Sequence, residues 1–379
     1  MEMGHNQQNR QGNQVRTLIA LRFFAVMLIV IHHLRYLFIP SLLNNENFGI
    51  LGVTFFLILS GFVISLSYSR FTRIADSFYF LWNRIVRIYP LHIITFFICL
   101  FIFFLRGFSI DIATAVINVF LLQSFFPSKD IYFSFNALSW MLSTLFFFYI
   151  VFSIANYKPR FFLWLYFFSL VGLLLSMTYI ETTQQGDNLW FRLWLLYIFP
   201  PNKLVVILLG VGTAKFFLKY LNQLKRWTGK IRGTLLEITV LLLTIDFIMW
   251  GKFANITKNV LLFFHTPFGK SLDLMNTNYI AAPIITLLVI AVFAVEKGII
   301  SQFLKTRPLL FLGEISFSIF ISHQLVINYF FCYYKQYLLY TFGQLMTVIL
   351  FLVFIIVLSS LIYTFIEDPI RKRLRISIQ

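Results

Sequence analysis

Two side chains that are able to do chemistry, Arg22 and His33, lie eleven positions apart in an otherwise apolar stretch. Eleven residues of an α-helix turn through about 1100°, so both side chains share one face, about 16 Å apart along the axis. A cation within a membrane usually faces a bundle interior or an aqueous cavity, because facing lipid costs several kcal/mol. The spacing therefore predicts a helix that walls a site, with His32 pointing elsewhere. Anchoring of Arg22 and the histidines in opposite headgroup layers is the alternative.

A second pair, Arg84 and Arg87, precedes Tyr89-Pro90 and is spaced three residues apart. On a helix the two arginines share a face, and their forked guanidinium groups suit a phosphate. Charge that only sets membrane topology is the alternative for this pair. The pair predicts a phosphate site on the cytoplasmic side.

Polar side chains inside other apolar runs are supporting or acceptor-side candidates. Taken singly, each of them also fits helix packing, interfacial anchoring, a structural hydrogen bond or an interfacial ion pair. The two cysteines, Cys99 and Cys332, both lie in apolar runs and predict neither a disulfide nor a metal site. The supporting candidates are Ser60, Trp140, Ser143, Tyr149, His323 and Glu367.

The composition is that of a polytopic helical membrane protein. Of 379 residues, 59% are hydrophobic and 20% aromatic, and the mean hydropathy is +0.83. Only 12% of the residues are charged, yet the net charge is +17. Lysine and arginine cluster in short loops between apolar runs, so membrane topology explains the excess and a nucleic-acid partner is not expected.

Apolar runs predict an all-α protein with about ten transmembrane helices in the lipid bilayer. A shorter run at 112–126 is expected to be re-entrant or interfacial, because counting it as a span would place the basic loop 219–232 outside. Both termini are then cytoplasmic. The expected division is a disordered tail 1–15, a membrane domain 16–370 and a basic tail 371–379. The ten runs lie near 16–38, 48–68, 90–106, 138–155, 160–180, 202–218, 234–250, 279–296, 308–331 and 341–366.

In their order along the chain, these motifs resemble the acyltransferase-3 family of integral membrane acyltransferases. Two departures stand out: Thr54 occupies a position that is acidic in many members, and residues 141–145 lack the glutamate of a Ser-Leu-Ser-Val-Glu-like stretch. The resemblance runs from about Thr17 to Arg373. It is carried by Arg22 with His33, by residues 52–62 (Gly-Val-Thr-Phe-Phe-Leu-Ile-Leu-Ser-Gly-Phe), by Arg84 with Arg87 before Tyr-Pro, by residues 312–323 (Leu-Gly-x-Ile-Ser to His) and by residues 367–369 (Glu-x-Pro).

The resemblance implies a stand-alone, glycan-modifying O-acyltransferase of the bacterial cytoplasmic (inner) membrane. It would move an acyl group, most often acetyl from acetyl-CoA, to a hydroxyl of a cell-surface glycan such as O-antigen, exopolysaccharide or a lipid-linked precursor. His33 is the expected general base, and Arg22 is expected to orient the acyl group or stabilise its oxyanion. Arg84 and Arg87 are expected to bind acyl-CoA, which is a substrate; no bound cofactor or metal is expected.

Alternatives remain at this point. A covalent acyl-enzyme on His33 or Ser143 is open. A transporter or flippase of a glycan or lipid intermediate also suits buried arginine and histidine, and a non-catalytic partner of a polysaccharide synthase is a third reading. The acceptor sugar, the length of the acyl group and the oligomeric state do not follow from the sequence.

Overall fold

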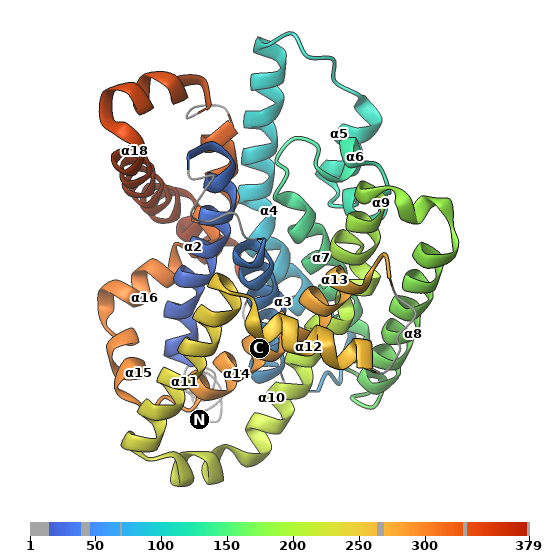
Figure 1. Cartoon of the computed structure of the whole chain (residues 1–379), viewed down its shortest axis with the longest axis vertical. Helices are drawn as coiled ribbons and strands as arrows, with labels where there is room; N and C mark the ends of the chain where they lie inside the picture. The colour runs from blue at the N-terminus through green and yellow to red at the C-terminus, as the bar shows by residue number, and fades with distance from the viewer. Residues whose placement is uncertain (1–14, 39–45, 69, 264–268, 329–331, 377–379) are drawn as a thin grey trace.

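The computed structural model describes residues 15–38, 46–68, 70–263, 269–328 and 332–376, and these ranges contain helices, turns and no strand (Figure 1). The α-helices are α2 (Arg16–Phe38), α3 (Asn47–Ser67), α4 (Ile74–Leu105), α5 (Ile112–Val119), α6 (Lys129–Tyr132), α7 (Ser139–Ala155), α8 (Phe161–Thr182), α9 (Leu189–Leu193), α10 (Pro200–Thr228), α11 (Lys230–Met249), α12 (Lys252–Phe263), α13 (Leu272–Met275), α14 (Ala282–Ala294), α15 (Ile299–Leu304), α16 (Arg307–Glu314), α17 (Ser316–Val326), α18 (Cys332–Ile362) and α19 (Asp368–Leu374). Short 3-10 segments are η1 (Gln123–Phe125) and η2 (Gln184–Asp187), and π-helical segments are η3 (Trp194–Ile198), η4 (Asn276–Ala281) and η6 (Tyr363–Glu367).

Seven helices of the described ranges are long and apolar enough to cross a membrane, and two bent pairs raise this to as many as nine. The pairs are α11 with α12, bent by 78°, and α16 with α17, bent by 55°. The remaining run of the predicted ten is α7, whose 17 residues extend about 25 Å, less than a hydrocarbon core of about 30 Å. The run at 112–126 forms the eight-residue α5 and the 3-10 turn η1, which are too short to span. The chain is therefore a multi-pass membrane protein.

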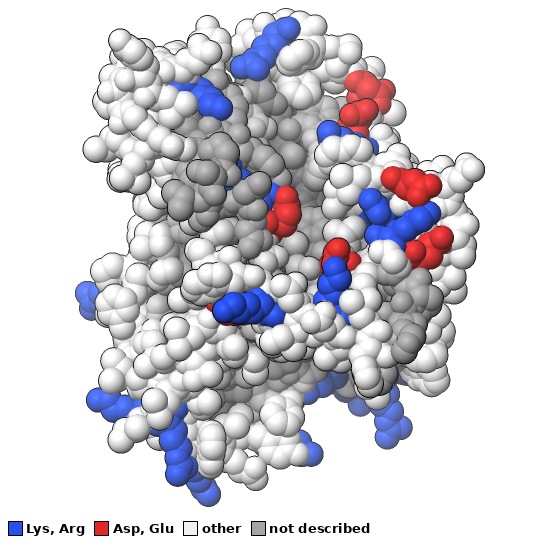
Figure 2. Space-filling view, viewed as in Figure 1, with Lys and Arg blue, Asp and Glu red and all other residues white. Residues whose placement is uncertain are grey.

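The charged side chains are distributed unevenly between the two ends of the molecule. In the view of Figure 2, lysine and arginine without acidic neighbours gather at the end where α10 and α11 meet; the upper right part mixes both signs, and some basic side chains also lie at the upper end. The basic loop 219–232 joins α10 to α11 there. The positive-inside rule predicts that this end faces the cytoplasm. The predicted tail 1–15 lies outside the described residues except for Val15, and the predicted basic tail 371–379 begins inside α19.

Helix α3 lies at the centre of the bundle and meets α10 backbone to backbone. A Cβ atom on Gly61 would lie 2.2 Å from the carbonyl oxygen of Ile207, and one on Gly210 would lie 2.0 Å from that of Ile58. Small residues at such crossings allow the backbones to approach, which is how helices pack tightly within a membrane. Glycine is therefore required at both positions.

Replacing Gly210 by alanine is expected to force α3 and α10 apart and to lower the free energy of unfolding by about 1–3 kcal/mol, as overpacking does. The measurement is the Tm of the purified protein in detergent. Gly212→Ala is the matched control, because a Cβ at Gly212 of the same helix has nothing within 4 Å. Equal Tm values for the two variants would show that the crossing tolerates a methyl group.

Candidate active site

Two histidines from distant parts of the chain meet between α2 and α17. Nδ1 of His33 lies 3.2 Å from Nε2 of His323, although 290 residues separate them. Each ring also approaches the carbonyl oxygen one turn earlier in its own helix: Nδ1 of His33 is 2.9 Å from Ile29 O, and Nδ1 of His323 is 3.0 Å from Ile319 O. His323 is fully buried, and His33 is partly buried.

These contacts assign the protons of the histidine pair. A carbonyl oxygen only accepts hydrogen bonds, so Nδ1 carries the proton in both His33 and His323. Nε2 of His323 then has a lone pair, and the one Nδ1–H of His33 is shared between this nitrogen and Ile29 O. The lone pair of His33 lies on Nε2, which makes no hydrogen bond with any other described residue. Nε2 of His33 is therefore the available basic nitrogen of the pair. His323 fixes the tautomer of His33, as the carboxylate of a Ser-His-Asp triad fixes the tautomer of its histidine.

The ring of His32 lies edge-on to that of His33, with 5.1 Å between the ring centroids. The His32 ring faces α3, where a Cβ on Gly49 would lie 2.7 Å from the His32 Cγ. Its Nε2 lies 3.9 Å from the carboxylate of Glu46, which also pairs with the buried guanidinium of Arg35. Motif reasoning missed this Arg35–Glu46 pair, because no fixed spacing connects the end of α2 to the start of α3.

Three arginines line one pocket of about 70 Å³ that contains neither histidine of the pair in its lining. Arg22 comes from α2, and Arg84 and Arg87 come from the first half of α4. Among the described residues none of the three forms an ion pair within 4.0 Å, and the buried Nε of Arg84 has no hydrogen-bond partner. Three converging guanidinium groups without a bound carboxylate form a site that favours an anion.

Aromatic side chains hold the Arg84 end of this arginine pocket. The guanidinium carbon lies 5.3 Å from the ring centroid of Tyr68, 5.5 Å from that of Phe80 and 6.0 Å from that of Tyr149. Contacts with ring faces position a cation without neutralising its charge. Arg84 therefore keeps its attraction for an anion.

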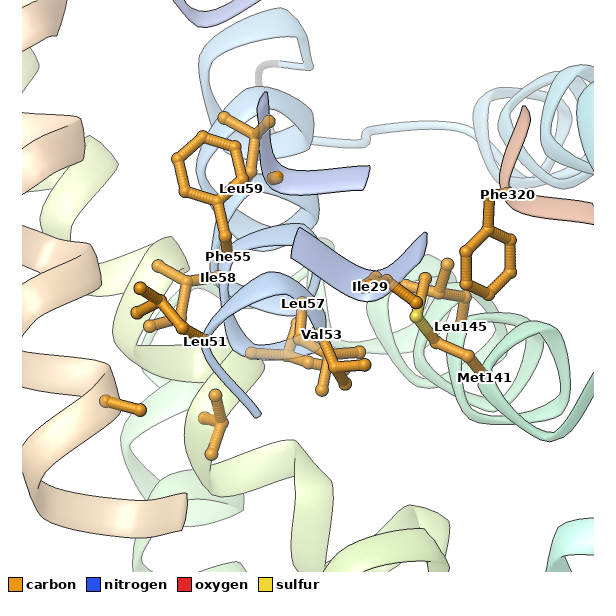
Figure 3. Packing of buried hydrophobic residues seen from close by; sticks show 14 of the residues in the cluster. Ile29, Leu51, Val53, Phe55, Leu57, Ile58, Leu59, Met141, Leu145 and Phe320 are labelled. Atoms are coloured by element: carbon orange, nitrogen blue, oxygen red, sulfur yellow. The ribbon is translucent and has the colours of Figure 1, made fainter. Parts of the chain in front are cut away.

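We call the apolar side chains between the arginine pocket and the histidine pair the apolar neck; three of them, Met141, Leu145 and Phe320, also line the pocket. Figure 3 shows Met141 and Leu145 of α7 beside Ile29 of α2 and Phe320 of α17. The Phe320 ring centroid lies 6.3 Å from that of Phe56 and 6.3 Å from that of His323, so Phe320 touches both regions. Because Arg22 and His33 are about 16 Å apart along α2, no single small group reaches both.

The structure places the supporting candidates in different surroundings. Ser60 and Tyr149 line the arginine pocket, and the hydroxyl of Ser60 donates to Phe56 O at 2.7 Å. Glu367 accepts a 2.6 Å hydrogen bond from Ser318 of α17. Trp140 packs its ring 5.1 Å from that of Tyr197.

The structure does not bring Ser143 to the lining of the arginine pocket. Its hydroxyl is buried, and its oxygen has no hydrogen-bond partner among the described residues. The geometry therefore gives this serine no base that would activate it.

A larger, open groove of about 470 Å³ lies along η2 and α9. Its only basic side chain, Lys129, sits 3.8 Å from the ring centroid of Trp190, and the lining holds no histidine, cysteine or carboxylate. The groove therefore has no group suited to acid–base chemistry, unlike the region between α2 and α17. In the described ranges, no group of three or more histidine, cysteine or acidic residues is arranged to hold a metal ion.

The chain is similar in sequence to known acyltransferases. The model of a family of acyltransferase domains matches residues 15–364. O-acetyltransferase OatA of Staphylococcus aureus is 26% identical over 382 residues, covering 94% of this chain and 57% of the relative. Acyltransferase MdmB of Streptomyces mycarofaciens is 30% identical over 226 residues, covering 52% of this chain and 56% of the relative. No solved structure matches the chain.

The chain thus spans little more than half the length of the curated relatives that it matches. The family match nevertheless covers the histidine pair, the arginine pocket and the neck between them. On this evidence the chain belongs to the acyltransferase-3 family.

Proposed function

We propose that this protein is a membrane O-acyltransferase that moves an acyl group, preferably acetyl, from acyl-CoA to a hydroxyl of a cell-surface glycan or its lipid-linked precursor. One observation carries the proposal: the arginine pocket, which attracts an anion, and His33, whose tautomer is fixed, lie on the two sides of the apolar neck. The names of the relatives, an acyltransferase and an O-acetyltransferase, support the same reaction class.

In this proposal the donor binds from the cytoplasmic side. Its phosphates interact with Arg84, Arg87 and Arg22, whose charges have no carboxylate partner within ion-pair distance among the described residues. The pocket has room for several water molecules or one phosphate group, so most of the nucleotide lies outside it. The flexible arm of the donor passes the neck and brings its thioester toward His33. Arg22 thus acts at the charged end of the donor, about 16 Å from His33 along the helix.

The chemical step needs one base at the far end of the neck. Nε2 of His33 takes the proton from the acceptor hydroxyl as that oxygen attacks the thioester carbonyl carbon. The C–S bond of the tetrahedral intermediate then breaks, and the CoA sulfur receives the proton from His33. The products are an ester on the acceptor and free CoA. His323 holds the Nδ1–H of His33 throughout, so Nε2 stays directed at the acceptor.

The proposed topology places this reaction across a bacterial cytoplasmic membrane. Ten spans with both termini cytoplasmic put the basic loop 219–232 and the arginine pocket on the inner side and the histidine pair toward the outer side. A donor made in the cytoplasm and an acceptor presented outside then meet on opposite faces of one bundle. This arrangement explains why guanidinium and imidazole groups occupy different depths.

The test is acyl transfer by the purified full chain in nanodiscs. We expect radiolabelled acetyl-CoA to lose its acetyl group, with release of the free thiol, only when a suitable glycan is present. A transporter or a non-catalytic synthase partner would leave the thioester intact with every acceptor. Mass spectrometry of surface polysaccharide from cells with and without the chain identifies the modified sugar.

A further inference from the structure

A buried lysine of α10 has no role in the chemistry described so far. Lys203 is 1% exposed, and no described carboxylate lies within 4.0 Å of its ammonium. Its ammonium lies 4.6 Å from the ring centroid of Tyr197 and 5.0 Å from that of Tyr279. Ring faces replace only part of the hydration that a buried cation loses, so Lys203 attracts an anion.

The two rings that hold Lys203 both come from π-helical turns, which are rare and frequently occur at functional sites. Tyr197 lies in η3 and Tyr279 in η4. The hydroxyl of Tyr279 donates to Leu196 O at 2.7 Å, which ties the two turns together. The Trp140 ring packs against Tyr197 at a centroid distance of 5.1 Å. The result is an aromatic box around one ammonium group.

The contacts of α3 give the depth of this aromatic box. Gly49 of α3 faces His32, whereas residues 58–61 of α3 face residues 207–210 of α10. With both helices running inward, Lys203 is level with about residue 54 of α3, about 8 Å below the level of the histidines. A helical side chain leans toward the start of its own helix, so the ammonium reaches back toward the outer side. Lys203 therefore lies between the depths of the arginine pocket and the histidine pair.

From these observations we infer that Lys203 and its aromatic box form an acceptor subsite that binds an acidic group, a carboxylate or a phosphate, carried by the saccharide. The inference rests on the proposed function, because it assigns the subsite to the acceptor. The nearby outer charges do not compete for this anion: the guanidinium of Arg35 is already paired with Glu46. The subsite would select acidic over neutral acceptors and hold the sugar for attack at His33.

The experiment compares Lys203→Met and Lys203→Arg with the wild-type chain in nanodiscs. Lys215→Met is the matched control, because Lys215 also belongs to α10 and places its ammonium 4.6 Å from the Phe162 ring centroid. Binding is measured without donor for three oligosaccharides of equal length, one with a uronic acid, one with a phosphate and one neutral. Acetyl-CoA affinity, Tm and acyl transfer are measured on the same samples.

We expect Lys203→Met to weaken binding of one acidic oligosaccharide by at least about tenfold, the size of a lost charge-assisted hydrogen bond. The acidic oligosaccharide that responds identifies the group as a carboxylate or a phosphate. Neutral oligosaccharide and acetyl-CoA should bind within twofold of wild type. Lys203→Arg should retain most of the preference, and Lys215→Met should retain all of it.

Equal effects of Lys203→Met on acidic and neutral oligosaccharides, or no effect on either, would overturn the inference. A lower Tm in both Lys203 variants than in the wild type would show that the lysine has a structural role instead. The two proposals fail separately: a chain that binds acidic saccharide through Lys203 but transfers no acyl group refutes only the proposed function. A chain that acylates glycans with no dependence on Lys203 refutes only the acceptor subsite.

Discussion

The His33→Ala variant is expected to fold, to bind acetyl-CoA within twofold of wild type and to lose acyl transfer by about 10²- to 10⁴-fold in kcat. A positioned general base contributes this much, and Nε2 of His33 is the basic nitrogen that the hydrogen bonds of the histidine pair leave available. The measurement is release of free CoA by purified protein with a saturating donor. Full activity in a well-folded His33→Ala protein would remove the base from the proposed mechanism.

Variants of the other two histidines of this region test the specificity of this result. His32→Ala should keep activity within about tenfold, because His32 faces Gly49 on α3 and not His323. His323→Ala should lower kcat with little change in KM for the donor, because His323 holds the tautomer of His33 and touches no substrate in the proposed mechanism. His323→Gln supplies a side-chain oxygen that accepts from Nδ1–H and should restore part of kcat.

The Arg84→Ala, Arg87→Ala double variant is expected to bind acetyl-CoA at least about 100-fold more weakly. Two charge-assisted contacts with phosphate are removed, each worth about 1.5–3 kcal/mol. Because neither arginine has an ion-pair partner within 4.0 Å among the described residues, little native structure is lost with them. The measurement is equilibrium binding of donor to the purified protein, with Tm as the folding check.

Arg73→Ala is the matched control for charge near the cytoplasmic surface. Arg73 precedes α4, its side chain is 64% exposed, and it pairs with Asp76 at 3.7 Å. Its removal takes away one positive charge outside the pocket, half of the charge lost in the double variant, so donor affinity should change by less than about twofold. If the double variant and Arg73→Ala behave alike, the arginine pair serves topology and not the donor.

The apolar runs predicted the helices well, because each run must bury its backbone hydrogen bonds within the membrane. The number of spans, about ten, stays a prediction. α7 has 17 residues, and α16 with α17 forms one run in sequence but bends by 55° at its middle. The length and hydropathy of an apolar run do not predict where its helix bends. They also do not predict how much of a short helix is buried by neighbouring helices.

For the candidate site, the sequence by itself determined that Arg22 and His33 share a face of one helix and that Arg84 and Arg87 share a face of another, because the helical period fixes directions within an element. Tertiary structure decided which faces meet. It brought Arg22 into the pocket of Arg84 and Arg87, and it placed His323 behind His33 across 290 residues. It also enclosed Lys203 between rings from two π-helical turns. Contacts between helices depend on close backbone approach and side-chain packing. The spacing of residues within one helix therefore does not predict which other helix packs against it.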